Sequence, residues 1–397
     1  MRERGRRVRE VDGVTETRGT LVEDAHFGDL LQDLVRRHEP EGILSVYLDI
    51  DPATAQREGY EAALLDTLRP LRARRYDTWA AGRLEYEAER VIEAVRAWEE
   101  PPGRAVAMFY SGPGGLALTI PLPVPVPSVA RFEARPVLGP LIAALEEHRR
   151  YAVVLFDKAR ARILTVLLGR VEEETEIESD VPGKSAVGGF GGYLQARYDR
   201  HREMHLHAHA RRTVERLWAL NRSRPIHTLI LAGPPEALAA LRAALPRALE
   251  RMAVVAEGVP MDATTADVVH RVEAIERAAH DAEDRAFVAS LLDTAKAHGA
   301  AVLGWQQTLE AVADGRVHKL AVITGVTRAG VECPRCDYLA VGEQARCPRC
   351  EEPLWEAPDL AEAAVRRALL ADSTVHYLTP ESGSELMPHE IGALLRY

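Results

Sequence analysis

A cluster of glycines, followed by a long stretch without glycine or proline, constrains the fold of this chain most. Gly188, Gly189, Gly191 and Gly192 fill four of five positions, and the next Gly or Pro is Pro225. Glycine loses more conformational freedom on ordering than other residues, so the cluster predicts a loop rather than a packed element. The stretch behind it predicts a helix that carries this loop at its tip.

The predicted helix is basic in a chain that is acidic overall. Between Arg197 and Arg224 there are eight arginines and three acidic residues, whereas the whole chain has a net charge of −10. The acidic balance argues against a protein that coats nucleic acid nonspecifically, but it allows one local basic surface. The glycine loop and the basic helix together predict a contact with a polyanion.

The chain is long enough for several domains. Its 397 residues are 47% hydrophobic, and strand-like apolar runs alternate with amphipathic stretches, which is typical of the α/β class. We expect three α/β domains after a disordered basic tail. The predicted bounds are 1–19 for the tail, 20–147 for the N-terminal domain, 148–260 for the middle domain with the glycine loop, and 261–397 for the C-terminal domain, with a zinc ribbon at 331–355.

Neither end of the chain nor its apolar runs predict a membrane or export signal. No run of about 18 apolar residues occurs, and the basic N-terminus is not followed by an apolar segment. All four cysteines lie between positions 333 and 350, so no disulfide framework is expected elsewhere. We expect a cytoplasmic protein without a membrane partner.

The cysteines form two C-x2-C pairs, Cys333 with Cys336 and Cys347 with Cys350. Each pair directs two thiolates at one point, and two pairs complete a tetrahedral zinc site. Four protein ligands leave no open position, so the expected zinc ion is structural and not catalytic.

Other patterns lead to no predicted active site. His201, His205 and His209 share a helix face, but the H-E-x-x-H motif is absent, so we interpret this face as a polar, RNA-facing surface. A P-loop is excluded because Glu178 stands where its first glycine is required, and no motif marks a serine or cysteine nucleophile. The run Glu172–Glu174 is expected to be a charged turn.

Three segments, taken in chain order, resemble the bacterial branch of the archaeo-eukaryotic class I peptide chain release factor and Pelota superfamily. Residues 191–202 are similar to the family's Gly-Gly-Gln loop and the Arg-rich helix behind it. Residues 309–323 resemble the start of its third domain, and the inserted cysteine pairs and the ending 391–397 resemble the rest of that domain.

The resemblance implies an RNase-H-like middle domain and a C-terminal domain like the kink-turn-binding ribosomal proteins. It implies the ribosome as partner, through rRNA and peptidyl-tRNA, and not DNA; a translational GTPase is a further partner it allows. The residues implied in catalysis are Gly191, Gly192 and Gln195. Those implied in RNA binding are Arg197, Tyr198, Arg200, Arg202, Arg211 and Arg212.

One departure from the family pattern leaves two functions open. Tyr193 follows the Gly-Gly pair where release factors have glutamine, and Gln195 comes two positions later. If Gln195 takes the role, the protein hydrolyses peptidyl-tRNA as a release or rescue factor. If it does not, the loop only occupies the A site of a hibernating or stalled ribosome. Tyr193 and Tyr198 are compatible with packing or with stacking on RNA, and the first domain has no codon-reading motif.

Overall fold

The computed structural model describes residues 10–11, 14–15, 27–50, 57–98, 100, 102–179 and 192–397. The chain divides into two compact units. Unit 1 combines Met1–Glu147 with Asp284–Tyr397, and unit 2 is His148–Glu283. The division into three domains remains a prediction. Within the predicted tail, β1 (Glu10–Val11) pairs with β2 (Val14–Thr15).

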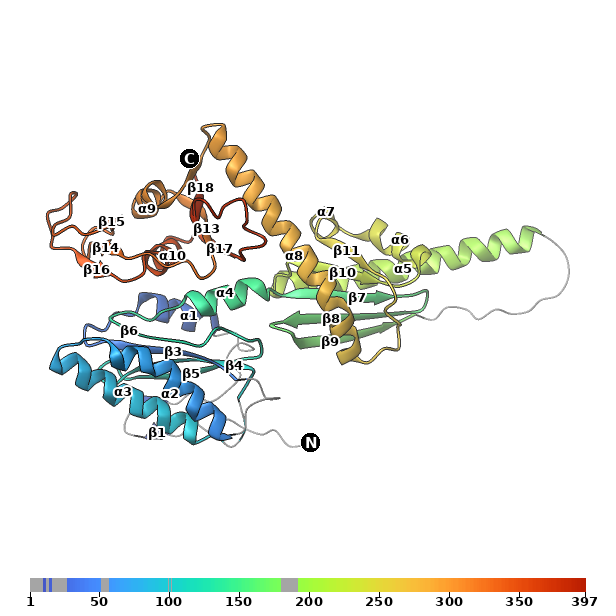
Figure 1. Cartoon of the computed structure of the whole chain (residues 1–397). Helices are drawn as coiled ribbons and strands as arrows, with labels where there is room; N and C mark the ends of the chain where they lie inside the picture. Colours follow the sequence, from blue (N-terminus) through green and yellow to red (C-terminus); the bar gives the residue numbers. More distant parts are fainter. Residues whose placement is uncertain are drawn as a thin grey trace. The chain divides into compact units, whose positions relative to one another are not determined.

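The N-terminal part of unit 1 is an antiparallel sheet with helices on it (Figure 1). The strand order is β5-β4-β3-β6. The strands are β3 (Ile43–Asp49), β4 (Ala105–Ser111), β5 (Leu116–Leu122) and β6 (Val129–Glu133). The helices are α1 (Phe27–Arg36), α2 (Arg57–Ala73), α3 (Thr78–Arg96) and α4 (Gly139–Glu147). Asp77 is the N-cap of α3, and its side chain accepts a hydrogen bond from the N–H of Ala80.

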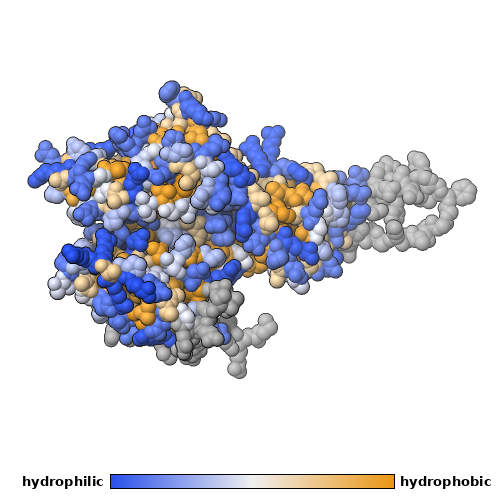
Figure 2. Space-filling view, in the orientation of Figure 1, coloured by the Kyte–Doolittle hydropathy of each residue, from blue (hydrophilic) through white to orange (hydrophobic). Residues whose placement is uncertain are grey.

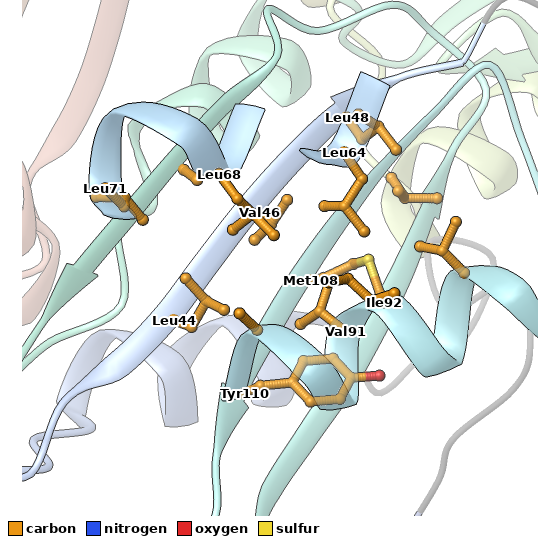
Figure 3. Close-up of a cluster of buried hydrophobic side chains, with 14 of the residues drawn as sticks. Leu44, Val46, Leu48, Leu64, Leu68, Leu71, Val91, Ile92, Met108 and Tyr110 are labelled. Atoms are coloured by element: carbon orange, nitrogen blue, oxygen red, sulfur yellow. The ribbon is translucent and has the colours of Figure 1, made fainter. Parts of the chain in front are cut away.

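The core of this part lies between the sheet and the helices α2 and α3 (Figure 3). Strands put alternate side chains on one face and helices repeat theirs every three or four residues, so the two patterns meet in one layer. The side chains that Figure 3 labels come from β3 (Leu44, Val46, Leu48), α2 (Leu64, Leu68, Leu71), α3 (Val91, Ile92) and β4 (Met108, Tyr110).

The C-terminal part of unit 1 contains a four-stranded sheet and a three-stranded one. The first has the order β12-β18-β13-β17, with β13 and β17 parallel, and the second has the order β15-β14-β16. The strands are β12 (Ala301–Leu303), β13 (Val317–Ile323), β14 (Gly330–Glu332), β15 (Leu339–Val341), β16 (Trp355–Ala357), β17 (Thr374–Leu378) and β18 (Ile391–Leu395). The helices are α9 (Trp305–Ala313) and α10 (Leu360–Leu370), and α8 (Thr265–Lys296) ends in this part.

Unit 2 is a five-stranded sheet covered on both faces. Its order is β11-β10-β7-β8-β9, in which β7, β8 and β9 are antiparallel neighbours and β7, β10 and β11 are parallel. The strands are β7 (Tyr151–Phe156), β8 (Arg160–Leu167), β9 (Arg170–Glu178), β10 (Thr228–Ala232) and β11 (Ala253–Ala256). The helices α5 (Gly192–Ser223), α6 (Pro235–Ala244) and α7 (Arg247–Glu250) contribute to one face, and the first turns of α8 cover the other.

The structure confirms the mixed α/β class but corrects one expectation. The run Glu172–Glu174 lies in β9, an edge strand, and not in a turn. The carboxylates are tolerated there because arginines pair with them: Arg150 with Glu172 at 2.5 Å, Arg216 with Glu173 at 2.5 Å, and Arg162 with Glu174 at 2.6 Å.

The face of the molecule shown in Figure 2 is mostly hydrophilic, with small hydrophobic patches. Large apolar side chains that are exposed include Trp79, Tyr86, Met204 and Val255. Among the described residues, no helix combines the length and the apolar character needed to cross a membrane.

Candidate functional site

The helix α5 follows the glycine cluster and extends past the core of unit 2 (Figure 1). Its inner face contributes Ala210, Val214, Leu217 and Leu220 to the core beside the sheet. Among the side chains of α5 that the structure describes, from residue 203 onward, Leu206 is the earliest to pack there. At 1.5 Å per residue, the part before Leu206 is about 20 Å long. We call residues 192–205 the arm.

Most of the residues predicted to take part in catalysis or RNA binding lie on this arm. Gly192 is the first residue of α5, and Gln195 lies in its first turn rather than in a loop. Arg197, Tyr198, Arg200 and Arg202 follow on the same helix. Gly191 lies outside the described residues, and the structure describes the backbone of these arm positions but not their side chains.

Arg211 and Arg212 are exposed where α5 meets the core. The Arg212 guanidinium donates a hydrogen bond to Ser179 Oγ at 2.5 Å. Ser179 directly follows β9, so Arg212 connects the helix to the end of the preceding strand. Arg216, one turn later, is held by Glu173 instead.

The histidines on α5 do not form one polar face. His207 is exposed, but His209 is fully buried, with its ring stacked on Phe156 at a centroid distance of 4.8 Å. The expectation of an RNA-facing surface is therefore wrong for His209. The helix turns this position toward the sheet, where Ser179 Oγ lies 2.6 Å from His209 Nδ1.

The four predicted zinc ligands come together in the C-terminal part of unit 1. The Sγ atoms of Cys333, Cys336, Cys347 and Cys350 all lie within 4.8 Å of one another. Cys333 Sγ is 3.5 Å from Cys350 Sγ, and Cys336 Sγ is 3.4 Å from Cys347 Sγ. Zinc–sulfur bonds of about 2.3 Å in a tetrahedron need separations of this order.

The two C-x2-C turns have the same backbone geometry. The N–H of Arg335 donates to Cys333 Sγ and that of Arg349 to Cys347 Sγ, both at 3.4 Å. The residue after each second cysteine is left-handed, with φ of 61° at Asp337 and 60° at Glu351. N–H donors stabilise thiolates, so the cluster can bind a metal ion, and its all-sulfur donor set fits zinc.

Reasoning from the sequence missed the part that Ser179 plays at the base of the arm. Ser179 belongs to no motif, and its partner His209 is 30 positions away. The signal that the sequence offered is the four-residue spacing on α5 that connects His209 to an apolar position. His209, Thr213 and Leu217 are spaced by four, in line with a helix face that packs.

Comparison with known proteins gives one match to a family and several to solved structures. Residues 136–277 match the family described as bacterial archaeo-eukaryotic release factor family 10. No protein with a curated description matches the chain.

The similar structures share little sequence with this chain. An archaeal translation termination factor, aRF1, is 15% identical, with 94% of this chain and 97% of that one covered and a TM-score of 0.26. Archaeoglobus fulgidus Pelota is 15% identical, with 74% and 79% covered and a TM-score of 0.31. Dom34 of S. cerevisiae, a translation termination-like factor that interacts with Hbs1, is 11% identical, with 74% and 79% covered and a TM-score of 0.41.

The family match contains both the glycine cluster and the whole of α5. It therefore confirms, for this part of the chain, the resemblance drawn from the sequence motifs. Over residues 136–277 the chain is similar to bacterial archaeo-eukaryotic release factor family 10.

Proposed function

We propose that the protein is a ribosome-binding translation factor of the release or rescue type. It binds the ribosomal A site and inserts residues 188–195, the glycine loop and the start of the arm, toward the peptidyl-tRNA. The family match over residues 136–277 carries this proposal, because it contains the loop and the helix. The extension of α5 past its core supports it, since a site deep in RNA is reached only by a narrow element.

The chemistry that we propose depends on position more than on a strong base. Gly191 and Gly192 let the backbone approach the acceptor end of tRNA, and Gln195 helps to orient a water molecule against the ester. Aligning reactants and stabilising the developing oxyanion both lower the barrier to hydrolysis. The arginines Arg197, Arg200, Arg202, Arg211 and Arg212 hold RNA phosphates, and Tyr198 contacts the same RNA.

We also propose a fold for the middle domain and one for the C-terminal domain. The strand order β9-β8-β7-β10-β11, with three antiparallel and three parallel strands sharing β7, supports an RNase-H-like middle domain over 148–260. For 261–397 we propose a domain like the kink-turn-binding proteins, with structural zinc on its four cysteines. The proposed partners are rRNA, peptidyl-tRNA and a translational GTPase, in the cytoplasm.

A second function, occupation of an idle or stalled ribosome without hydrolysis, is favoured by one observation. Gln195 lies in the first turn of α5, and Tyr193 takes the position next to the glycines. A helical backbone restricts how far a side chain two positions later can reach back to a loop. In this alternative the arm only fills the A site.

Peptide release separates the two functions. Ribosomes with labelled peptidyl-tRNA are mixed with the wild type, Gln195→Ala and Gly192→Ala. Gln306→Ala is the control, because Gln306 is exposed on α9. The release function predicts that wild type and control free the peptide and that both arm variants lose at least about tenfold in rate. Binding of all four proteins without release would contradict hydrolysis and support occupation.

The salt dependence of ribosome binding tests the basic helix. Binding through phosphates weakens with salt because counterions are released, and each lost contact lowers the slope of log K against log salt by roughly one. Arg197→Ala and Arg200→Ala should each show this lower slope. Arg247→Ala, on the exposed surface of α7, should keep the wild-type slope. Equal slopes for all variants would contradict the assignment.

A further inference from the structure

Three segments of unit 2 meet at the end of β9. They are Ser179, the turn between β7 and β8, and the α5 turn that contains His209. The N–H of Ser179 donates to the carbonyl of Ala159 at 2.7 Å. In the same turn, Asp157 Oδ1 accepts the N–H of Ala159 at 2.8 Å and of Arg160 at 2.6 Å. The main chain at Ser179 is therefore tied to a turn that is itself braced.

The side chain of Ser179 is held from two directions by α5. Its Oγ lies 2.6 Å from His209 Nδ1 and accepts a hydrogen bond from Arg212 at 2.5 Å. A guanidinium can only donate, so Ser179 Oγ is the acceptor in its bond with Arg212 and keeps both its proton and a second lone pair for His209 Nδ1. The hydroxyl therefore connects two neighbouring side chains of α5 to the end of β9.

The His209 ring has little freedom to leave this position. It is fully buried and stacked on Phe156, with an angle of 18° between the rings. On the helix side, Thr213 Oγ1 donates to the carbonyl of His209 at 3.0 Å. The contact between Ser179 and His209 is thus built into the packing of β7 and α5.

The contact between Ser179 and His209 lies where the arm joins the core of unit 2. In the sequence, the glycine cluster lies between Ser179 and the start of α5, and His209 is the first fully buried side chain among the described ones of α5, residues 203–223. From Gly192 to Ala208 the helix is about 25 Å long, so a rotation of about 10° at His209 would move its start by about 4 Å. Misplacement of this size is large for a reacting geometry.

We propose that Ser179, His209 and Arg212, which we call the arm anchor, are positioning residues that set the direction of the arm and of the glycine loop. This inference rests on the proposed function, because it assigns the anchor a role in placing the loop. Ser179 and His209 act through α5 and need not touch the substrate, whereas Arg212, which is exposed, can also contact RNA as proposed above.

The anchor also predicts a dependence on pH. Burial lowers the pKa of His209 below its ordinary value of about 6.5, the Arg212 charge lowers this pKa further, and the backbone of Arg160 and the carboxylate of Asp157 act against the change. Protonation would place a positive charge on a buried ring next to the charge of Arg212. The anchor is therefore complete above about pH 6.5 and opens as the pH falls through the lowered pKa.

Amide hydrogen exchange of the full-length protein tests the anchor without ribosomes. Ser179→Ala removes the shared hydroxyl, and His209→Asn keeps an acceptor near the Nδ1 position without a titrating ring. His207→Asn is the matched control, because His207 is exposed on the same helix. Exchange in β10 and β11 reports whether each variant is folded.

We expect Ser179→Ala to raise exchange at least about tenfold at residues 176–179 and 203–209 and to leave β10 and β11 unchanged. After correction for intrinsic rates, wild type and control should lose protection there as the pH falls from 7.5 through the lowered pKa of His209. His209→Asn should keep the protection across this range. Wild-type protection in Ser179→Ala, or a wild-type pH profile in His209→Asn, would overturn the anchor.

Ribosome experiments on the same proteins separate the anchor from the proposed function. If the wild type does not sediment with ribosomes, the proposed function fails, whatever the exchange data show. If the wild type binds, Ser179→Ala should bind within about threefold of it while crosslinking from position 193 to rRNA falls at least fivefold. Unchanged crosslinking despite raised exchange would overturn the positioning role.

Discussion

At the scale of single residues, Glu362 makes a contact that joins distant parts of unit 1. It lies on α10, and its carboxylate accepts the N–H of Leu138 at 3.0 Å and of Gly139 at 2.6 Å, at the start of α4. The carboxylate thus caps a helix 223 positions earlier in the chain. A Cβ at Gly139 would lie 2.2 Å from Glu362 Oε1, so the contact requires glycine there.

The titration of Glu362 should be visible in the stability of the protein. Burial raises the pKa of Glu362 to about 7, the two N–H donors act against this, and the nearby Asp359 and Glu133 raise the pKa further. An acid with a raised pKa in the folded state holds its proton more tightly when folded. Its contribution to stability is therefore complete below the unfolded pKa and is lost as the pH rises to about 7.

We predict that Glu362→Gln removes this part of the pH dependence. Relative to the variant, the free energy of unfolding of the wild type should fall by up to about 3 kcal/mol between pH 5 and 8. Denaturant melts at several pH values measure this difference. Glu310→Gln, an exposed substitution on α9, should follow the wild type. A constant offset between wild type and Glu362→Gln would contradict the prediction.

The contacts that could be predicted from the sequence and those that could not differ in how far apart the partners lie along the chain. The four cysteines lie within 18 positions and repeat one spacing, so their meeting point was predictable. Glu362 and Gly139 meet across 223 positions, and Ser179 and His209 across 30. No local pattern records such a contact, because it exists only after the sheets have formed.

At the scale of elements, α2 illustrates a contact that periodicity does predict. Leu64 is fully buried against the first sheet, whereas its neighbour Leu65 is 38% exposed. We predict that Leu64→Ala lowers the free energy of unfolding by about 2–5 kcal/mol, because it leaves a cavity. Leu65→Ala should cost less than about 1 kcal/mol. Chemical denaturation measures both, and equal losses would contradict the packing of α2.

We expect the folding of the three-stranded sheet and its four cysteines to depend on a bound zinc ion. The sheet is small, and Cys333 and Cys347 supply buried thiols where a larger core would otherwise be needed. We predict about one zinc per chain by elemental analysis. A strong chelator should raise amide exchange in residues 330–357 while β3 and β4 stay protected. Full protection of 330–357 in metal-free protein would count against a structural zinc site.

The strand β9 shows why a strand can be taken for a turn when only its sequence is considered. Its sequence places five glutamates among nine residues, a composition that argues against a strand. The structure forms it because Arg150, Arg162 and Arg216 neutralise carboxylates on both sides of an edge strand. Strand propensity describes each residue alone, whereas these arginines come from β8, from α5 and from the connection before β7.

At the scale of the whole molecule, unit 1 combines two stretches of chain separated by unit 2. Besides the contact of Glu362, His38 stacks on Trp355 at a centroid distance of 5.4 Å, and Arg135 lies 3.6 Å from Glu332. The predicted domain bounds treat these stretches as separate. A sequence read from one end to the other shows where compact segments begin, but not which of them pack together later.

We propose that the glycine loop and the arm enter the peptidyl-transferase region of the ribosome. A photo-crosslinking amino acid at position 193, in full-length protein bound to ribosomes, tests it most directly, with position 247 on α7 as the control. We expect crosslinks from position 193 to large-subunit rRNA around the peptidyl-transferase centre, lost at high salt, and none there from position 247. Efficient binding with no such crosslink, or with the same crosslinks from both positions, would contradict it.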